Sequence, residues 1–244
     1  VLTLSCAICW SQELTNTNSY IEPTKPEATE VWEPKPKIVN PGKIGAPPSD
    51  ALVLFDGTNF DEWMSPRDSS EAKWTLNKDG SMTVKLGRGI GDIQTKRNFG
   101  DIQLHIEWKS PDEIVGDGQN RGNSGVFLQT LYEIQVLDNN DNDTYVNGQV
   151  GSIYKQAIPL AQASTPTGEW NVYDIIYHAP RFGELGEVVK KATVTVLHNG
   201  ILILNHKELI GPTEYIGWPK YKPHGKLPIM LQNHNCEVSY RNIW

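Results

Sequence analysis

Residues 101–108, 131–138 and 230–234 alternate apolar side chains with side chains that can transfer protons or bind hydroxyl groups. The polar positions are Gln103, His105 and Glu107, then Glu133 and Gln135, then Gln232 and His234. Side chains two positions apart on a β-strand lie on the same face, so each segment is expected to have one apolar and one polar face. Carboxylates and imidazoles can move protons near neutral pH, and amides bind hydroxyl groups.

Two interpretations of these polar faces are open. In an antiparallel sheet one face is commonly solvated, and a polar stripe then needs no further function. Alternatively, neighbouring strands combine their polar faces into a concave surface suited to sugar hydroxyls. The eight Trp and nine Tyr residues fit both interpretations, because aromatic rings fill cores and also stack on sugar rings.

Short alternating or apolar runs bounded by Gly, Asn, Asp and Pro predict the strands that position these side chains. The predicted strands are residues 52–55, 81–85, 102–108, 125–129, 132–137, 172–177, 192–197, 201–204, 229–231 and 238–243. Asn199-Gly200 predicts a two-residue hairpin, because both residues accept a positive φ. No window predicts an amphipathic helix. We therefore predict an all-β, two-sheet antiparallel jelly-roll sandwich of the concanavalin A-like type in one domain, residues 51–244.

The first 50 residues have a different composition. Residues 1–12 are expected to be the remnant of a secretory signal peptide, because VLTLSCAICW is apolar, uncharged and too short to span a bilayer. Residues 13–50 are rich in Pro and polar residues and predict an extended or disordered tail, with an ordered arm as the alternative. We expect a periplasmic or extracellular protein. Lipid anchoring through Cys6 is an alternative, although Thr3-Leu4-Ser5 is a poor lipobox.

Charge and composition disfavour several functional classes. The 22 Lys and Arg residues against 29 Asp and Glu residues give a net charge of -7, which argues against a nucleic-acid partner. No run of 18 apolar residues predicts a transmembrane helix. Cys236 is the single cysteine after residue 12, so no intrachain disulfide is expected in the domain.

A series of motifs runs through the predicted domain. They are Leu54-Phe55-Asp56-Gly57, Gly91-Asp92, Gly122-Asn123-Ser124-Gly125, Tyr132-Glu133-Ile134-Gln135, Gly151-Ser152-Ile153-Tyr154-Lys155, Gly168-Glu169-Trp170-Asn171, Leu231-Gln232-Asn233-His234 and Tyr240-Arg241-Asn242-Ile243. Each motif alone is weak, but the set in this order is specific. It resembles the 3-keto-disaccharide hydrolase domain family over residues 51–244.

The resemblance implies a concanavalin A-like jelly roll that acts on a glycoside or oligosaccharide already oxidised to a ketone at carbon 3. In that chemistry a base removes the proton at carbon 2, an enediolate forms, the leaving group departs and water adds. The base needs a pKa near ambient pH, and the enediolate needs a nearby cation or hydrogen-bond donors. The resemblance implies no organic cofactor, and for some members it implies a divalent metal.

The resemblance also implies roles for individual residues. The catalytic candidates are Glu133, His234, Lys155 and Glu107, and the candidate metal ligands are Glu133, His234 and Asp138. The candidate substrate-binding residues are Asn123, Gln135, Asp138, Gln232 and Tyr154. Each role has a structural alternative: Glu133 can bond a neighbouring strand, His234 can belong to a turn, and Lys155 can be a solvated charge. The acidic run 138–143 could bind calcium or form a solvated loop.

Two departures from the family pattern place this chain in a subgroup. Asn233-His234-Asn235 stands where the family usually has Asp-His-Gly, and Lys155 replaces a Gly found in many members. The additional segment 211–226 carries aromatic, basic and His residues and is predicted to cover the substrate. A carbohydrate-binding module without catalysis and a structural or adhesive surface domain remain alternatives, because a fold does not fix a function.

Overall fold

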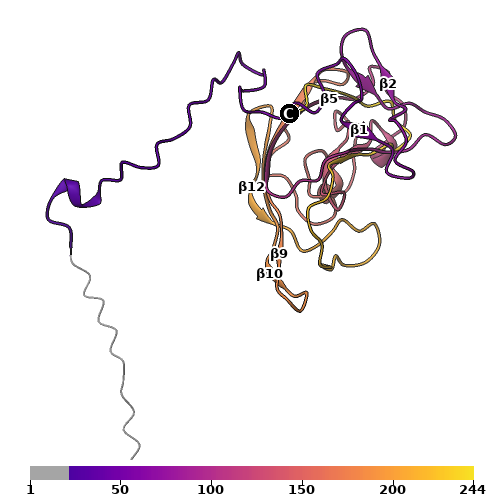
Figure 1. Cartoon of the computed structure of the whole chain (residues 1–244). Coiled ribbons are helices and arrows are strands. Elements are labelled where there is room, and N and C mark those ends of the chain that lie inside the picture. Colours follow the sequence, from indigo (N-terminus) through magenta and orange to yellow (C-terminus); the bar gives the residue numbers. More distant parts are fainter. Residues whose placement is uncertain (1–21) are drawn as a thin grey trace, which may run out of the picture. The chain divides into compact units, whose positions relative to one another are not determined.

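The computed structural model describes residues 22–244 (Figure 1). The predicted signal-peptide remnant, Cys6 and the first part of the predicted tail lie outside the described residues. Residues 22–39 belong to one unit and contain the 3-10 helix η1 (Pro26–Thr29), whereas residues 40–244 form a second unit with all the described strands. Between residues 22 and 244 no helix has the length and apolar character needed to cross a bilayer.

The second unit contains two antiparallel sheets. The five-stranded sheet has, in spatial order, β1 (Trp63–Met64), β4 (Ile93–Thr95), β13 (Met230–Leu231), β6 (Ser124–Leu128) and β7 (Tyr132–Val136). The seven-stranded sheet has β12 (Ile201–Glu208), β11 (Thr193–His198), β8 (Asn171–His178), β5 (Ile102–Lys109), β14 (Ser239–Arg241), β3 (Met82–Thr83) and β2 (Thr75–Leu76). This arrangement confirms the predicted all-β sandwich.

The connections complete the unit. A two-stranded ribbon of β9 (Arg181–Phe182) and β10 (Val188–Lys190) projects beyond the sheets in Figure 1. Two short 3-10 helices, η2 (Gly118–Asn120) and η3 (Val146–Gly148), lie in the segments before β6 and after β7. Strands close in sequence thus pair as hairpins, while β13 and β14 insert between strands from earlier in the chain.

The core forms where the apolar faces of the two sheets meet, as the alternation of side chains predicts. Ile106 and Trp108 of β5 and Ile134 of β7 are at most 1% exposed. Two buried tyrosines also cross the core. Tyr240 Oη donates to Ser124 Oγ at 2.6 Å, and Tyr173 Oη donates to the backbone oxygen of Gln135 at 2.8 Å. A buried polar group without a partner costs about 1–3 kcal/mol, so these bonds favour one alignment of the two sheets.

Most of the predicted strands are present, but one is not. The Asn199-Gly200 hairpin is confirmed, with φ values of 52° and 79° and with His198 paired to Ile201. The prediction of a strand at residues 52–55 is wrong, because only Phe55 pairs, as an isolated bridge to Ile243. The strands β1, β2, β4, β9 and β10 were not predicted, since two or three residues are too few to show a periodicity.

Candidate active site

A pocket of about 540 Å³ opens on the face of the five-stranded sheet that points away from the core. Three neighbouring strands, β13, β6 and β7, supply its floor. The floor residues are Phe127, Glu133, Gln135 and Gln232, and the walls are Gln119, Asn120, Asn123, Tyr145, Tyr154, Lys155, Thr213, Tyr215 and His234. Two of the predicted polar stripes, those of residues 131–138 and 230–234, therefore meet here, with β6 between them.

Glu133 is the buried acidic group of this pocket. The residue is 4% exposed, and burial raises the pKa of its carboxyl from 4.5 to about 8. Burial is the whole cause of the shift, because no donor or cation among the described residues offsets it. The backbone N–H of Glu133 donates to Thr213 Oγ1 at 3.0 Å. A carboxyl group with this pKa can accept and return a proton near neutral pH.

A glycine on the neighbouring strand makes room for this carboxylate. A Cβ atom at Gly125 would lie 2.6 Å from Glu133 Oε1 and 2.8 Å from Phe127 Cε2. Such distances are shorter than van der Waals contact, so any larger residue at position 125 displaces the carboxylate. The Gly122-Asn123-Ser124-Gly125 motif therefore does more than form a turn, because the absence of a side chain at Gly125 leaves the space that the Glu133 carboxylate fills.

Lys155 brings a positive charge to the pocket wall and is surrounded by tyrosines. Its Nζ donates to the backbone oxygen of Tyr215 at 2.7 Å and lies 4.3 Å from the centre of the Tyr215 ring. It also lies 5.6 Å from the Tyr154 ring and 5.7 Å from the Tyr145 ring. These contacts hold the ammonium group at the pocket wall and leave two of its three N–H groups for other acceptors.

The two wall tyrosines form a hydroxyl pair. The Oη atoms of Tyr145 and Tyr154 are 2.6 Å apart. Burial raises the pKa of Tyr154, and the hydrogen bond with Tyr145 and the charge on Glu133 raise it further. Burial also raises the pKa of Tyr145, so both hydroxyls stay protonated at neutral pH. Because one hydroxyl donates to the other, the pair has one O–H left to donate to a ligand.

A chain of amides fixes the polar groups beside Glu133. Gln119 Nε2 donates to the backbone oxygen of Gly148 at 2.8 Å, so that Gln119 Oε1 is free to accept from Gln135 Nε2 at 3.1 Å. Asn123 Nδ2 donates to the backbone oxygen of Gln119 at 2.6 Å. The buried Oε1 atoms of Gln135 and Gln232 have no partner among the described residues. The amide orientations are thus set by backbone carbonyls, and two acceptors remain for a ligand or water.

His234 lies on an exposed turn at the pocket rim. The backbone N–H of Asn233 donates to Asp92 Oδ1 at 2.8 Å, and its side chain accepts from the N–H of Asn235 at 3.0 Å. The Asn233 amide also donates to the backbone oxygen of Lys85 at 3.3 Å, which an ionised Asp could not do. The departure from the Asp-His-Gly pattern is therefore accommodated by a hydrogen-bonded turn that still presents His234 to the pocket.

The structure places Glu107 in the other sheet, outside the pocket. It accepts hydrogen bonds from Arg241 and from Asn242 Nδ2. Burial would raise the pKa of Glu107, but hydrogen bonds from His105, Asn242 and Arg241 lower it to about 2. The third polar stripe, that of residues 101–108, thus forms a charged cluster on the seven-stranded sheet and does not join Glu133.

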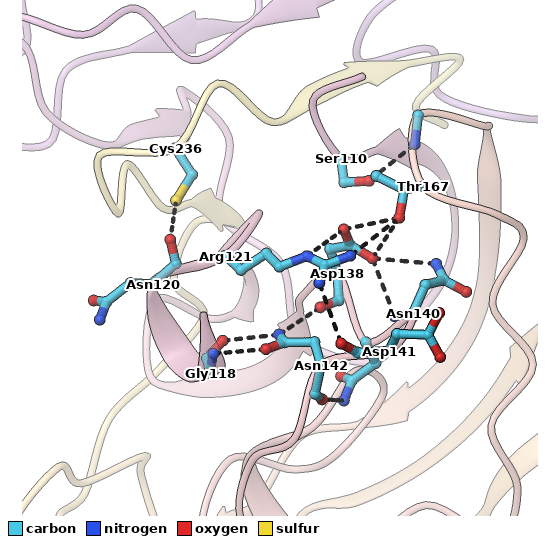
Figure 2. Close-up of polar contacts among 12 residues, drawn as sticks. Ser110, Gly118, Asn120, Arg121, Asp138, Asn140, Asp141, Asn142, Thr167 and Cys236 are labelled. Carbon is cyan, nitrogen blue, oxygen red and sulfur yellow. Dashed lines mark hydrogen bonds and ion pairs between the residues drawn. The ribbon is translucent and has the colours of Figure 1, made fainter. Parts of the chain in front are cut away.

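Asp138 also lies outside the pocket, in a buried polar cluster (Figure 2). Its Oδ2 accepts from Arg121 Nε at 2.9 Å and from Thr167 Oγ1 at 2.9 Å. Asp138 is 3% exposed and Arg121 is 7% exposed. Asn142 of the same run is also buried, and it bonds the backbone of Gly118. Asp138 and Asn142 of the run 138–143 are therefore structural residues. The Asp138 carboxylate forms an ion pair with Arg121.

The three predicted metal ligands do not converge. Glu133 and His234 line the pocket, whereas Asp138 lines a separate cavity of about 150 Å³ together with Arg121 and Cys236. Within residues 22–244 no group of three His, Cys, Asp or Glu side chains is arranged to hold a metal ion. Glu133, His234 and Asp138 therefore do not form one metal site.

Several pocket residues were not predicted. Tyr145, Gln119 and Phe127 come from a loop, from η2 and from β6, and none stands out by type or spacing. Thr213 and Tyr215 belong to the segment 211–226, whose aromatic composition did indicate a position over the substrate. Phe127 lies opposite Glu133 because β6 pairs with β7, and the other residues reach the pocket through the packing of loops and η2. Local periodicity reports neither arrangement.

The fold and the pocket define the class of this protein: a jelly-roll sandwich with a polar, tyrosine-lined site on one sheet. Residues 50–244 match the family model described as the 3-keto-alpha-glucoside-1,2-lyase-like domain, and the chain belongs to this family. A solved structure described as a putative glycosyl hydrolase, from Parabacteroides distasonis ATCC 8503, is 50% identical with a TM-score of 0.85. The match covers 90% of this chain and 95% of that chain.

A second structure from the same organism and with the same description supports the fold alone. It is 19% identical with a TM-score of 0.57, and the match covers 78% of this chain and 90% of that one. Among curated proteins the comparison finds no match.

Proposed function

We propose that this protein cleaves glycosides that carry a ketone at carbon 3, by elimination followed by addition of water. The observation that carries the proposal is Glu133, a buried carboxyl whose pKa burial raises to about 8, placed in an open polar pocket. Family membership and the similarity to glycosyl hydrolase structures supply the class of substrate. A site that only binds sugars needs no such desolvated base.

In the proposed reaction Glu133 takes the proton from carbon 2 of the oxidised ring. The electron pair of the C–H bond forms an enediolate, and the negative charge moves to the ketone oxygen. The Lys155 ammonium and the Tyr145–Tyr154 hydroxyl pair line the same pocket and supply charge and donors for this oxygen.

The carbon 1–oxygen bond then breaks, its electron pair leaves with the departing oxygen, and that oxygen takes a proton. We assign proton donation to the leaving group to His234, because it lies at the pocket rim where the leaving group must exit. Water then adds across the new double bond: its hydroxyl bonds carbon 1, Glu133 returns its proton to carbon 2, and His234 takes the remaining proton of the water, so the net reaction is hydrolysis. Asn123, Gln135 and Gln232 bind the hydroxyl groups of the ring. No step requires a metal.

Glu133→Gln tests the base. Product release from a 3-keto-glucoside is expected to fall about 100-fold to 10,000-fold, the contribution of a general base. Glu208→Gln is the matched control, since Glu208 is exposed on β12 of the other sheet. Lys155→Met and His234→Gln are expected to lower turnover while the protein stays folded. Full activity in Glu133→Gln would refute the assignment, and tight glycan binding without turnover by the native protein would identify a binding module.

A further inference from the structure

The loop that closes one side of the pocket carries a row of exposed apolar side chains. Tyr215 is 72% exposed, Ile216 is 83% exposed and Trp218 is 82% exposed. Tyr215 also lines the pocket, so the row begins at the site and runs away from it along the chain. In Figure 1 the golden loop that follows β12 extends from the body of the domain.

The backbone of this loop is fastened to the pocket at its start. The N–H of Thr213 donates to the backbone oxygen of Leu131 at 2.7 Å, and Thr213 Oγ1 accepts from the N–H of Glu133 at 3.0 Å. Two residues later, Lys155 Nζ donates to the backbone oxygen of Tyr215 at 2.7 Å. The proposed base and the proposed cation therefore both hold the beginning of the loop.

The end of the loop is fastened as well. Tyr221 Oη accepts from the N–H of Ala192 at 2.9 Å and donates to the backbone oxygen of Leu209 at 2.9 Å. Between the fastened ends, Gly217 has φ of 93°, a conformation that L side chains rarely adopt, and this permits the reversal at the tip. The aromatic side chains are thus displayed from a restrained backbone, which reduces the ordering entropy that a ligand must overcome.

We propose that residues 213–218 form the subsite for the leaving group of the glycoside, and that the subsite takes an uncharged ring with an apolar face, such as a second pyranose or an aryl group. This proposal rests on the proposed function. With the oxidised ring over Glu133, the group on its carbon 1 extends toward solvent, and Tyr215 is an exposed wall residue from which the apolar row continues. The rings of Tyr215 and Trp218 offer apolar faces against which C–H groups or an aryl ring can stack.

The test compares two 3-keto-glucosides, one with a methyl leaving group and one with a second glucose. Trp218→Ala is expected to raise KM for the disaccharide about threefold to tenfold and to change KM for the methyl glycoside less than twofold. Tyr215→Ala is expected to affect both substrates and the disaccharide more, because it also removes the ring that lies beside Lys155 in the pocket. Leu185→Ala is the control, because Leu185 is 96% exposed between β9 and β10 and lies outside the pocket lining.

Equal effects on both substrates, or no effect on either, would overturn the subsite. A change in molecular mass on size-exclusion chromatography in Trp218→Ala, with both KM values unchanged, would show that the loop binds a second copy of the chain.

Failure of the proposed function is distinguishable from failure of the subsite. If the native protein cleaves neither substrate, calorimetric binding of the disaccharide and of the methyl glycoside to native protein and to Trp218→Ala decides the subsite by itself. Selective loss of disaccharide affinity in Trp218→Ala supports the subsite, and equal affinities overturn it.

Discussion

Glu133→Gln should slow catalysis about 100-fold to 10,000-fold and stabilise the folded protein at alkaline pH, because the substitution removes a carboxylate that the fold holds out of water. The carboxyl is 4% exposed, and burial raises its pKa from 4.5 to about 8. At pH 7 only about a tenth of the molecules carry the ionised base. The value of kcat/KM in the native protein is therefore expected to rise about tenfold per pH unit below pH 8 and to level off above it.

The same pKa shift sets the sign of the effect on stability. A carboxyl whose pKa is raised on folding holds its proton more tightly in the folded than in the unfolded chain. The stability that this provides is present below pH 4.5 and is lost as the pH rises through 8. At about 1.4 kcal/mol per pH unit, the free energy of unfolding falls by roughly 5 kcal/mol across this window. Gln has no charge to desolvate, so Glu133→Gln should lack this contribution to the pH dependence.

The assays are kcat/KM from pH 5 to 10 on a 3-keto-glucoside and urea unfolding of both proteins at pH 5 and pH 9. Glu208→Gln, at an exposed position on the other sheet, should follow the native protein in both assays. A rate that is flat from pH 6 to 9 would refute the assignment of Glu133 as the titrating base. Equal pH dependence of unfolding in native protein and Glu133→Gln would show that the carboxyl is not desolvated.

Other substitutions separate the site from the scaffold. Gly125→Ala should lower kcat/KM about 100-fold with little loss of stability, because the new Cβ would meet Glu133 Oε1 at 2.6 Å and displace the base. Asp138→Asn should cost about 3–5 kcal/mol in urea unfolding by leaving buried Arg121 without its partner, while kcat/KM of the folded fraction stays native. Burial would lower the pKa of His105, but its two carboxylate partners raise it from 6.5 to about 9. His105→Gln should therefore destabilise the protein most below pH 6.5, with the difference shrinking as the pH passes 9, as urea unfolding would show.

Local patterns predicted much of the framework. Alternation along residues 102–108 and 132–137 identified both strands and the faces that pack in the core, and Asn199-Gly200 identified a hairpin. The short strands β1, β2, β4, β9 and β10 were not predicted, because they are strands only through their pairing with neighbouring strands. The prediction for residues 52–55 failed for the corresponding reason: the segment is apolar, but apart from the Phe55 bridge no strand pairs with it.

The sequence by itself determined that the domain is an all-β sandwich and that three strands carry polar stripes, because alternation along a strand is a property of the strand alone. The order of strands in the sheets decided which stripes meet. The stripes of β7 and β13 share one sheet with β6 between them, whereas that of β5 lies in the other sheet. Only this long-range pairing distinguishes Glu133, buried without a partner in the pocket, from Glu107 and Asp138, which arginines neutralise elsewhere. The surroundings that the fold supplies, more than the residue type, set the pKa of each carboxyl and thus which one can act as the base.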